Sequence, residues 1–176
     1  AGSDVTVTAK SGDATVGTVK ARDGEVTITA GSTATITTAT AGTDATIKAD
    51  KVKAGTIKAT TGDVEVTATS ISAKNVVAGN DATMSAESDV VVSGTIKANS
   101  NIFVESLGGD TTIGNAISGN QILIESVGNT SLGSLSTKNL DIYTQNLSAD
   151  AISTGTAILN TADTNIKSFD GDNIQI

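Results

Sequence analysis

Acidic residues beside glycine are the first groups in this sequence that could bind a metal ion. They occur as "FDGDN" at 169–173 and as "GGD" at 108–110. Carboxylate oxygens are ligands that Ca²⁺ takes in proteins. However, the chain contains neither the full EF-hand loop nor the repeated G-G-x-G-x-D pattern of calcium-binding repeats. We therefore expect no metal site and no cofactor.

Groups for acid–base and nucleophilic catalysis are scarce. The 176 residues include no His and no Cys, so the usual general base and the thiolate nucleophile are both missing. Glycoside-cleaving enzymes use paired carboxylates, but no acidic pair recurs here at one place with a basic partner. No segment between the apolar runs is long enough to wall a cleft. The sequence therefore predicts a protein that is not an enzyme.

The charge of the chain excludes two classes of partner. The net charge is −8 at pH 7, which argues against binding to nucleic acid or to anionic membranes. No apolar run approaches the roughly 18 residues of a membrane span, so no membrane insertion is expected. The charge is also uneven: residues 1–97 hold 9 basic and 11 acidic residues, whereas residues 98–176 hold 2 basic and 8 acidic residues.

The elements that would position any site are set by an internal repeat. "GTVKA" at 17–21 returns as "GTIKA" at 55–59 and at 94–98. Alternating segments such as "DVTVTA" from Asp4 and "EVTITA" from Glu25 fill the intervals, so the unit is about 19 residues long. Each unit holds three short apolar segments separated by Gly, Asn, Asp or Ser, which turn a chain easily. This pattern predicts three strands and three corners per unit.

One such unit cannot enclose its own apolar face, but stacked units pair every strand with the next and close a dry interior. The sequence therefore predicts an all-β chain that folds as a single domain over 1–176. The expected architecture is a right-handed parallel β-helix (β-solenoid) of about nine coils. Its first buried ladder is expected to comprise Val5, Val26, Ala45, Val64, Ala82, Ile102, Ile122, Leu140, Ala157 and Ile174.

Outward positions of the first strand carry any surface function, since their neighbours point inward. In the early coils these positions are Thr6, Thr8, Thr27 and Thr29. A flat array of paired threonines on a solenoid could order water or bind a glycan. Lys48 and Glu65 interrupt the array in the next coils, and exposed Thr is also simply a good strand former.

The same face becomes apolar in the later coils. Phe103, Leu123 and Ile158 point outward there, with Tyr143 beside them, although the chain has few large apolar groups. Contiguous exposed apolar surface marks an interface, so these four residues are a candidate lateral interface. The alternatives are a covering loop or a local change of register.

The repeat resembles that of a known family. "DVTVTAKSGDATVGTVKARDG" at 4–24 and "DVEVTATSISAKNVVAGN" at 63–80 are similar to the haemagglutinin-type repeats of filamentous-haemagglutinin-like exoproteins, the large two-partner-secretion adhesins. The resemblance covers essentially the whole chain. It implies a β-helical shaft that is extracellular or at the bacterial cell surface. The secretion domain of that family, with its Asn-Pro-Asn motifs, has no counterpart in a chain without Pro.

The two ends of the chain predict how it assembles. The first strand begins at Asp4, and the chain ends on "NIQI" in the same apolar phase, so Val5, Val7, Ile174 and Ile176 are candidates for end-to-end stacking. The expected function is that of a structural extracellular protein, either a shaft or a filament subunit, in adhesion or in surface or matrix assembly. The expected partner is the protein itself, as a homopolymer, with a surface glycan or receptor as the other candidate. The alternative function is an ice- or glycan-binding module.

Overall fold

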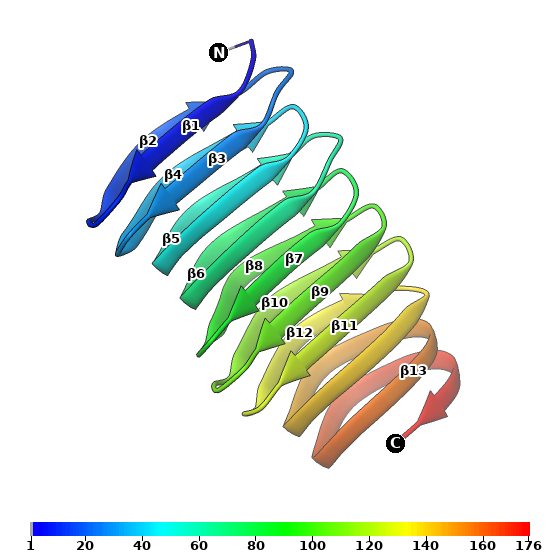
Figure 1. The fold of residues 1–176 in the computed structure, drawn as a ribbon. Coiled ribbons are helices and arrows are strands. Elements are labelled where there is room, and N and C mark those ends of the chain that lie inside the picture. The colour runs from blue at the N-terminus through cyan, green and yellow to red at the C-terminus, as the bar shows by residue number, and fades with distance from the viewer. Residues whose placement is uncertain (1) are drawn as a thin grey trace.

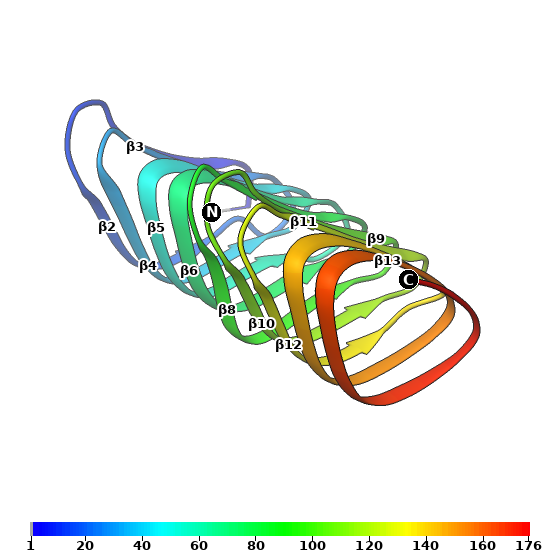
Figure 2. The same cartoon turned by 90° about the horizontal axis from the view of Figure 1, so that it is seen from below.

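The computed structural model describes residues 2–176, which contain β-strands and turns and no helix. The strands stack as successive turns of one parallel β-solenoid, with the two chain termini at opposite ends of a rod (Figure 1). Viewed from below, each turn follows a rounded outline around a narrow interior (Figure 2). The predicted all-β parallel solenoid is confirmed.

Each turn contributes one strand segment to a first ladder and one to a second. The first ladder consists of β1 (Val5–Ala9), β3 (Val26–Ala30), β5 (Ala45–Ala59), β6 (Val64–Ala78), β7 (Ala82–Ala86), β9 (Asn101–Ser106), β11 (Gln121–Ser126) and β13 (Asn139–Gln175). The second consists of β2 (Ala14–Lys20), β4 (Thr33–Ala41), β8 (Val90–Ala98), β10 (Thr111–Ser118) and β12 (Thr130–Ser136). The later parts of β5, β6 and β13 complete the second ladder.

The rod has about eight turns of about 19 residues, one fewer than the sequence predicts. The ninth interval begins at Ala157, which is buried, but residues 160–176 are all exposed or half-buried. That interval therefore forms the partly uncovered end of the rod and does not enclose another section of core.

The predicted apolar ladder forms the wall of the core. Consecutive members lie opposite one another from Val5 to Leu140. Those from Val26 to Ala157 are buried, whereas Val5 is half-buried and Ile174 is 48 % exposed. A buried Val or Ile contributes about 1.5–3 kcal/mol relative to an exposed one. The ladder therefore contributes to the stability of the rod together with the other buried residues of the core.

The second and third predicted strands of a unit are one bent strand, not two separated by a corner. In the first turn β2 passes through Gly17 without interruption. At the corresponding bend of later turns, Gly94, Gly114 and Gly133 follow one another. A Cβ on Gly114 would lie 2.5 Å from the carbonyl oxygen of Gly94, so close backbone approach explains the glycine there.

Aspartates link successive turns at the corners. Asp44 accepts a hydrogen bond from the backbone N–H of Asp63 at 2.7 Å, and Asp63 in turn accepts one from Asp81 at 2.9 Å. Asp4 and Asp81 make the same contact to the turn that follows them. Each carboxylate thereby pairs an N–H group that the strand ladder leaves free at the corner.

The inner corner after the first strand changes from alanine to hydroxyl residues along the rod. Alanine occupies this position through Ala86, and then Ser106, Ser126 and Thr144 follow. The buried Ser106 hydroxyl donates to the carbonyl oxygen of Ser88 at 2.6 Å, and the Thr144 hydroxyl donates to that of Gly128 at 2.8 Å. Hydrogen bonding therefore compensates for the burial of these polar groups.

Candidate functional site

The surface with the most distinctive chemistry is the outward side of the first ladder, here called the outer face. Its side chains form two rows that run along the rod, because strand residues alternate between inside and outside. Row one comprises Thr6, Thr27, Thr46, Glu65, Thr83, Phe103, Leu123 and Asp141. Row two comprises Thr8, Thr29, Lys48, Thr67, Ser85, Glu105, Glu125 and Tyr143.

The threonines proposed as a ligand surface lie side by side in the first two turns. Thr6 lies opposite Thr27, and Thr8 lies opposite Thr29. Row two continues with Lys48, whose ammonium nitrogen is 3.9 Å from a carboxylate oxygen of Glu65. Both charged side chains are about half exposed, at 57 % and 50 %. The paired threonines therefore extend over two turns before this ion pair replaces them.

The later half of the outer face carries the large apolar side chains. Phe103 lies opposite Leu123, and both are half-buried. Tyr143 and Ile158 are more open, at 39 % and 42 % exposed. The structure brings all four residues of the predicted lateral interface onto the last turns of the rod, where their side chains reach solvent.

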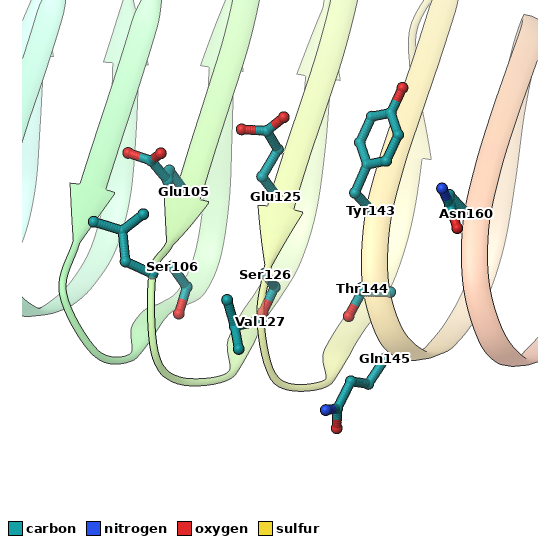
Figure 3. A pocket seen from close by; sticks show the side chains of 10 residues that line it. Glu105, Ser106, Glu125, Ser126, Val127, Tyr143, Thr144, Gln145 and Asn160 are labelled. Carbon is teal, nitrogen blue, oxygen red and sulfur yellow. The ribbon is translucent and has the colours of Figure 1, made fainter.

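A shallow open pocket of about 500 Å³ lies beside these residues. Glu105, Glu125 and Tyr143 project from neighbouring turns along one side of it, and Val127 lies on the adjoining corner (Figure 3). The Glu105 carboxylate accepts a hydrogen bond from the Ser85 hydroxyl at 2.7 Å. None of the lining residues is basic, so the pocket is acidic with an aromatic side.

Two exposed apolar residues of this region are absent from the sequence prediction. Leu107 and Val127 are 57 % and 59 % exposed at the corner that follows the first ladder. Leu107 also lines a second hollow of about 430 Å³ whose wall includes Thr29 and Lys48. The signal in the sequence is the 20-residue spacing between "ESLGG" at 105–109 and "ESVGN" at 125–129, which places Leu107 and Val127 at equivalent positions.

The charged groups elsewhere are dispersed. Among residues 2–176, no three Asp or Glu side chains lie close enough together to hold a metal ion. The backbone N–H of Thr33 and then the Ser32 hydroxyl lower the pKa of Asp13. A hydrogen bond to Asp150, at 2.7 Å, raises the pKa of Lys167.

The residues predicted to stack end to end lie in the first turn and in the partly uncovered end that follows the last turn. Val5 and Val7 are half-buried against the first section of core. Ile174 and Ile176, at the other end, are 48 % and 78 % exposed. The structure therefore places the two pairs at opposite ends of the rod (Figure 1).

Comparison of the chain with family models, with curated proteins and with solved structures finds no match. The pairing of the strands in successive turns shows that the fold is a β-solenoid. Within residues 2–176, no helix is long and apolar enough to cross a membrane.

Proposed function

We propose that this protein is a structural rod: a β-helical shaft, or a subunit that stacks head to tail into a filament. The observation that carries the proposal is the continuity of the strand ladders from the first turn to the last. Every inner turn is held by the turn before it and the turn after it. Such an architecture is extended by adding turns, because each added turn repeats the same contacts.

The terminal turns support stacking of further solenoid turns on either end. The same alternation of apolar and polar residues is found at both ends: Val5 and Val7 at one end correspond to Ile174 and Ile176 at the other. Asn173 precedes Ile174 just as Asp4 precedes Val5, and Asp4 accepts the N–H of Glu25 in the next turn. Asn173 could accept an N–H group of an added turn in the same way. The added turns come from another copy or from the same polypeptide.

The biological setting we propose is extracellular. It rests on the resemblance of the repeat to the shafts of filamentous-haemagglutinin-like exoproteins, which act at the bacterial cell surface. A rod of this kind serves adhesion, surface assembly or a matrix by spanning distance, and no chemical step is assigned to it. Its principal partner is a further copy of the chain, with a surface glycan or receptor as the second class.

Charge placed in the end turns tests this proposal. Val5→Asp or Ile174→Asp buries a carboxylate in a stacked end and is expected to stop growth of the 176-residue chain. Thr18→Asp, on an exposed position of β2 in the first turn, is the control. Sedimentation velocity should show large concentration-dependent species for the unmodified chain and for the control, but no species larger than a side-by-side pair of rods for the two end variants. A chain that sediments as a monomer at high concentration contradicts the filament form.

An ice- or glycan-binding module is the second candidate, and the in-register pairs Thr6/Thr27 and Thr8/Thr29 favour it. We rank it lower because Lys48 and Glu65 end the threonine array after few turns. Thermal hysteresis, or glycan binding that is lost on Thr27→Lys, would reverse this ranking.

A further inference from the structure

The two halves of the outer face differ in side-chain size. For this comparison the turns are numbered one to eight by their first-ladder strands, from β1, β3 and β5 to β9, β11 and β13. Turns one to three present threonines and Lys48, whereas turns six to eight present Phe103, Leu123 and Tyr143. One half is therefore low and polar. The other half stands higher and combines these large side chains with the carboxylates of Glu105, Glu125 and Asp141.

The two halves also differ in how their charges are compensated. Glu65 of turn four has a cation beside it, because Lys48 of turn three lies 3.9 Å away. Glu105 and Glu125 lie directly opposite each other on turns six and seven, an arrangement of like charges that is unfavourable unless a cation joins it. No basic side chain of the described chain lines their pocket. The later half is thus complementary to a surface that supplies a cation.

We infer that the outer face binds the outer face of a second copy, with the two rods antiparallel. The two copies are related by a twofold axis that lies between them and runs parallel to the strands of the first ladder. This rotation keeps each row against the same row and reverses the order of the turns. With turn three opposite turn six, Lys48 faces Glu105 of the second copy, and Thr46 faces its Phe103.

The same register makes the rest of the two faces complementary. Turn two lies opposite turn seven, so Thr27 faces Leu123 and Thr29 faces Glu125. Turn one lies opposite turn eight, which brings Thr8 against Tyr143. Small residues of turns one to three therefore meet larger ones of turns six to eight, whereas at the centre Glu65 faces Thr83 and Thr67 faces Ser85. Each contact occurs twice because the interface is isologous.

The size of the contact predicts its strength. A face about 16 Å wide and about 38 Å long follows from five-residue strands and eight turns at the usual strand spacings. It would bury about 600 Å² on each copy, which lies at the low end for specific interfaces. The side-by-side pair is therefore weak and forms at raised concentration. It does not depend on end-to-end stacking, since it doubles the width of a rod and leaves its length unchanged.

Disulfide trapping tests the pairing and its direction. The natural chain has no Cys, so Thr29→Cys and Glu125→Cys each introduce a single thiol and leave Phe103 and Leu123 intact. The antiparallel pair predicts a disulfide-linked dimer when the two variants are mixed and oxidised, and little when either is oxidised alone. Lys53→Cys, on the second ladder, mixed with Glu125→Cys gives the background level. The proposal is overturned if the mixture of Thr29→Cys and Glu125→Cys cross-links no more than this background. It is also overturned if Thr29→Cys cross-links efficiently with itself, because that result indicates parallel rods.

Substitution of the charged pair gives a second test that needs no cysteine. Lys48→Glu and Glu105→Lys are each expected to weaken lateral association by about tenfold, and the double exchange should restore it because Lys48 and Glu105 interact across the interface. Phe103→Ser should weaken it at least as much. The readout is sedimentation equilibrium of Val5→Asp protein, in which growth from the ends is blocked. Equal association of the single and double exchange variants contradicts the register. A Val5→Asp chain that stays monomeric at high concentration contradicts the lateral pair but does not bear on end-to-end stacking.

Discussion

The carboxylate of Asp13 accepts a hydrogen bond from the backbone N–H of Thr33, which lies in the next turn, at 2.9 Å. This contact favours the ionised carboxyl and holds its pKa below the usual 3.8. Because the pKa is lower in the folded chain than in the unfolded chain, Asp13 stabilises the fold above the unfolded pKa. That contribution disappears as the pH falls through the folded value.

Asp13→Ala is therefore expected to lower the melting temperature at neutral pH. The difference from the natural chain should be constant above about pH 5, where the carboxyl is ionised in both states. It should shrink below about pH 4, as first the unfolded and then the folded chain takes up the proton. Thermal unfolding followed by circular dichroism across this range measures it. A difference that stays constant down to pH 2 would show that the ionised carboxylate is not responsible.

Ile122 is fully buried in the first ladder, between Ile102 and Leu140. Ile122→Asp places a carboxylate with no partner among apolar side chains and should cost several kcal/mol, on the order of 3–5. Leu123→Asp is the matched control, since the adjacent side chain points outward. Urea unfolding at low protein concentration should show a large loss for the first variant and a small one for the second. Equal losses would mean that the inward and outward positions are assigned incorrectly.

Gly114 lies where two turns approach closely. Gly114→Ala would bring a Cβ to 2.5 Å from the Gly94 carbonyl oxygen, and relief of this overlap is expected to cost about 1–3 kcal/mol. Gly17 lies at the bend of the first turn, and a Cβ there meets nothing within 4 Å. Gly17→Ala should therefore leave the free energy of unfolding unchanged or slightly raised. A neutral Gly114→Ala would refute close packing at the bend.

Thr111 and Thr130 lie opposite each other in β10 and β12, and both are buried. The Thr130 hydroxyl donates to that of Thr144 at 3.0 Å, whereas the Thr111 hydroxyl has no partner among the described residues. Val90 occupies the equivalent place in the preceding turn. Thr111→Val should therefore stabilise the rod by about 1 kcal/mol, and Thr130→Val should destabilise it by a similar amount. Changes of the same sign in both variants would contradict this assignment of the hydrogen bonds.

The ladder could be predicted from sequence because a solenoid repeats one local pattern. Val26, Val64 and Ile102 recur at nearly constant spacing, and stacking converts that spacing into direct contact. The outward rows follow from the same register, so the sequence alone predicts that Thr6 lies against Thr27 and that Phe103 lies against Leu123. The number of turns could not be predicted, because the spacing of apolar residues does not distinguish an enclosed turn from an uncovered end.

Features that depend on contact between turns could not be predicted. The sequence does not reveal that Asp44 binds the N–H of Asp63, nor that Ser106 replaces a corner alanine with its hydroxyl paired to a carbonyl. The pocket between Glu105, Glu125 and Tyr143 likewise arises because three turns bring their side chains to one side. Each of these contacts depends on how two neighbouring turns are positioned relative to each other along the rod. The sequence pattern does not contain this information.

Negative-stain electron microscopy of the pure 176-residue chain tests the central claim, that the protein is a structural rod that extends from its ends. Eight turns at the usual strand spacing make a single rod about 40 Å long. Fibres whose length increases with protein concentration are expected for the natural chain, and particles that stay about 40 Å long are expected for Val5→Asp under the same conditions. Particles about 40 Å long at every concentration, identical for the natural chain and the variant, would contradict it.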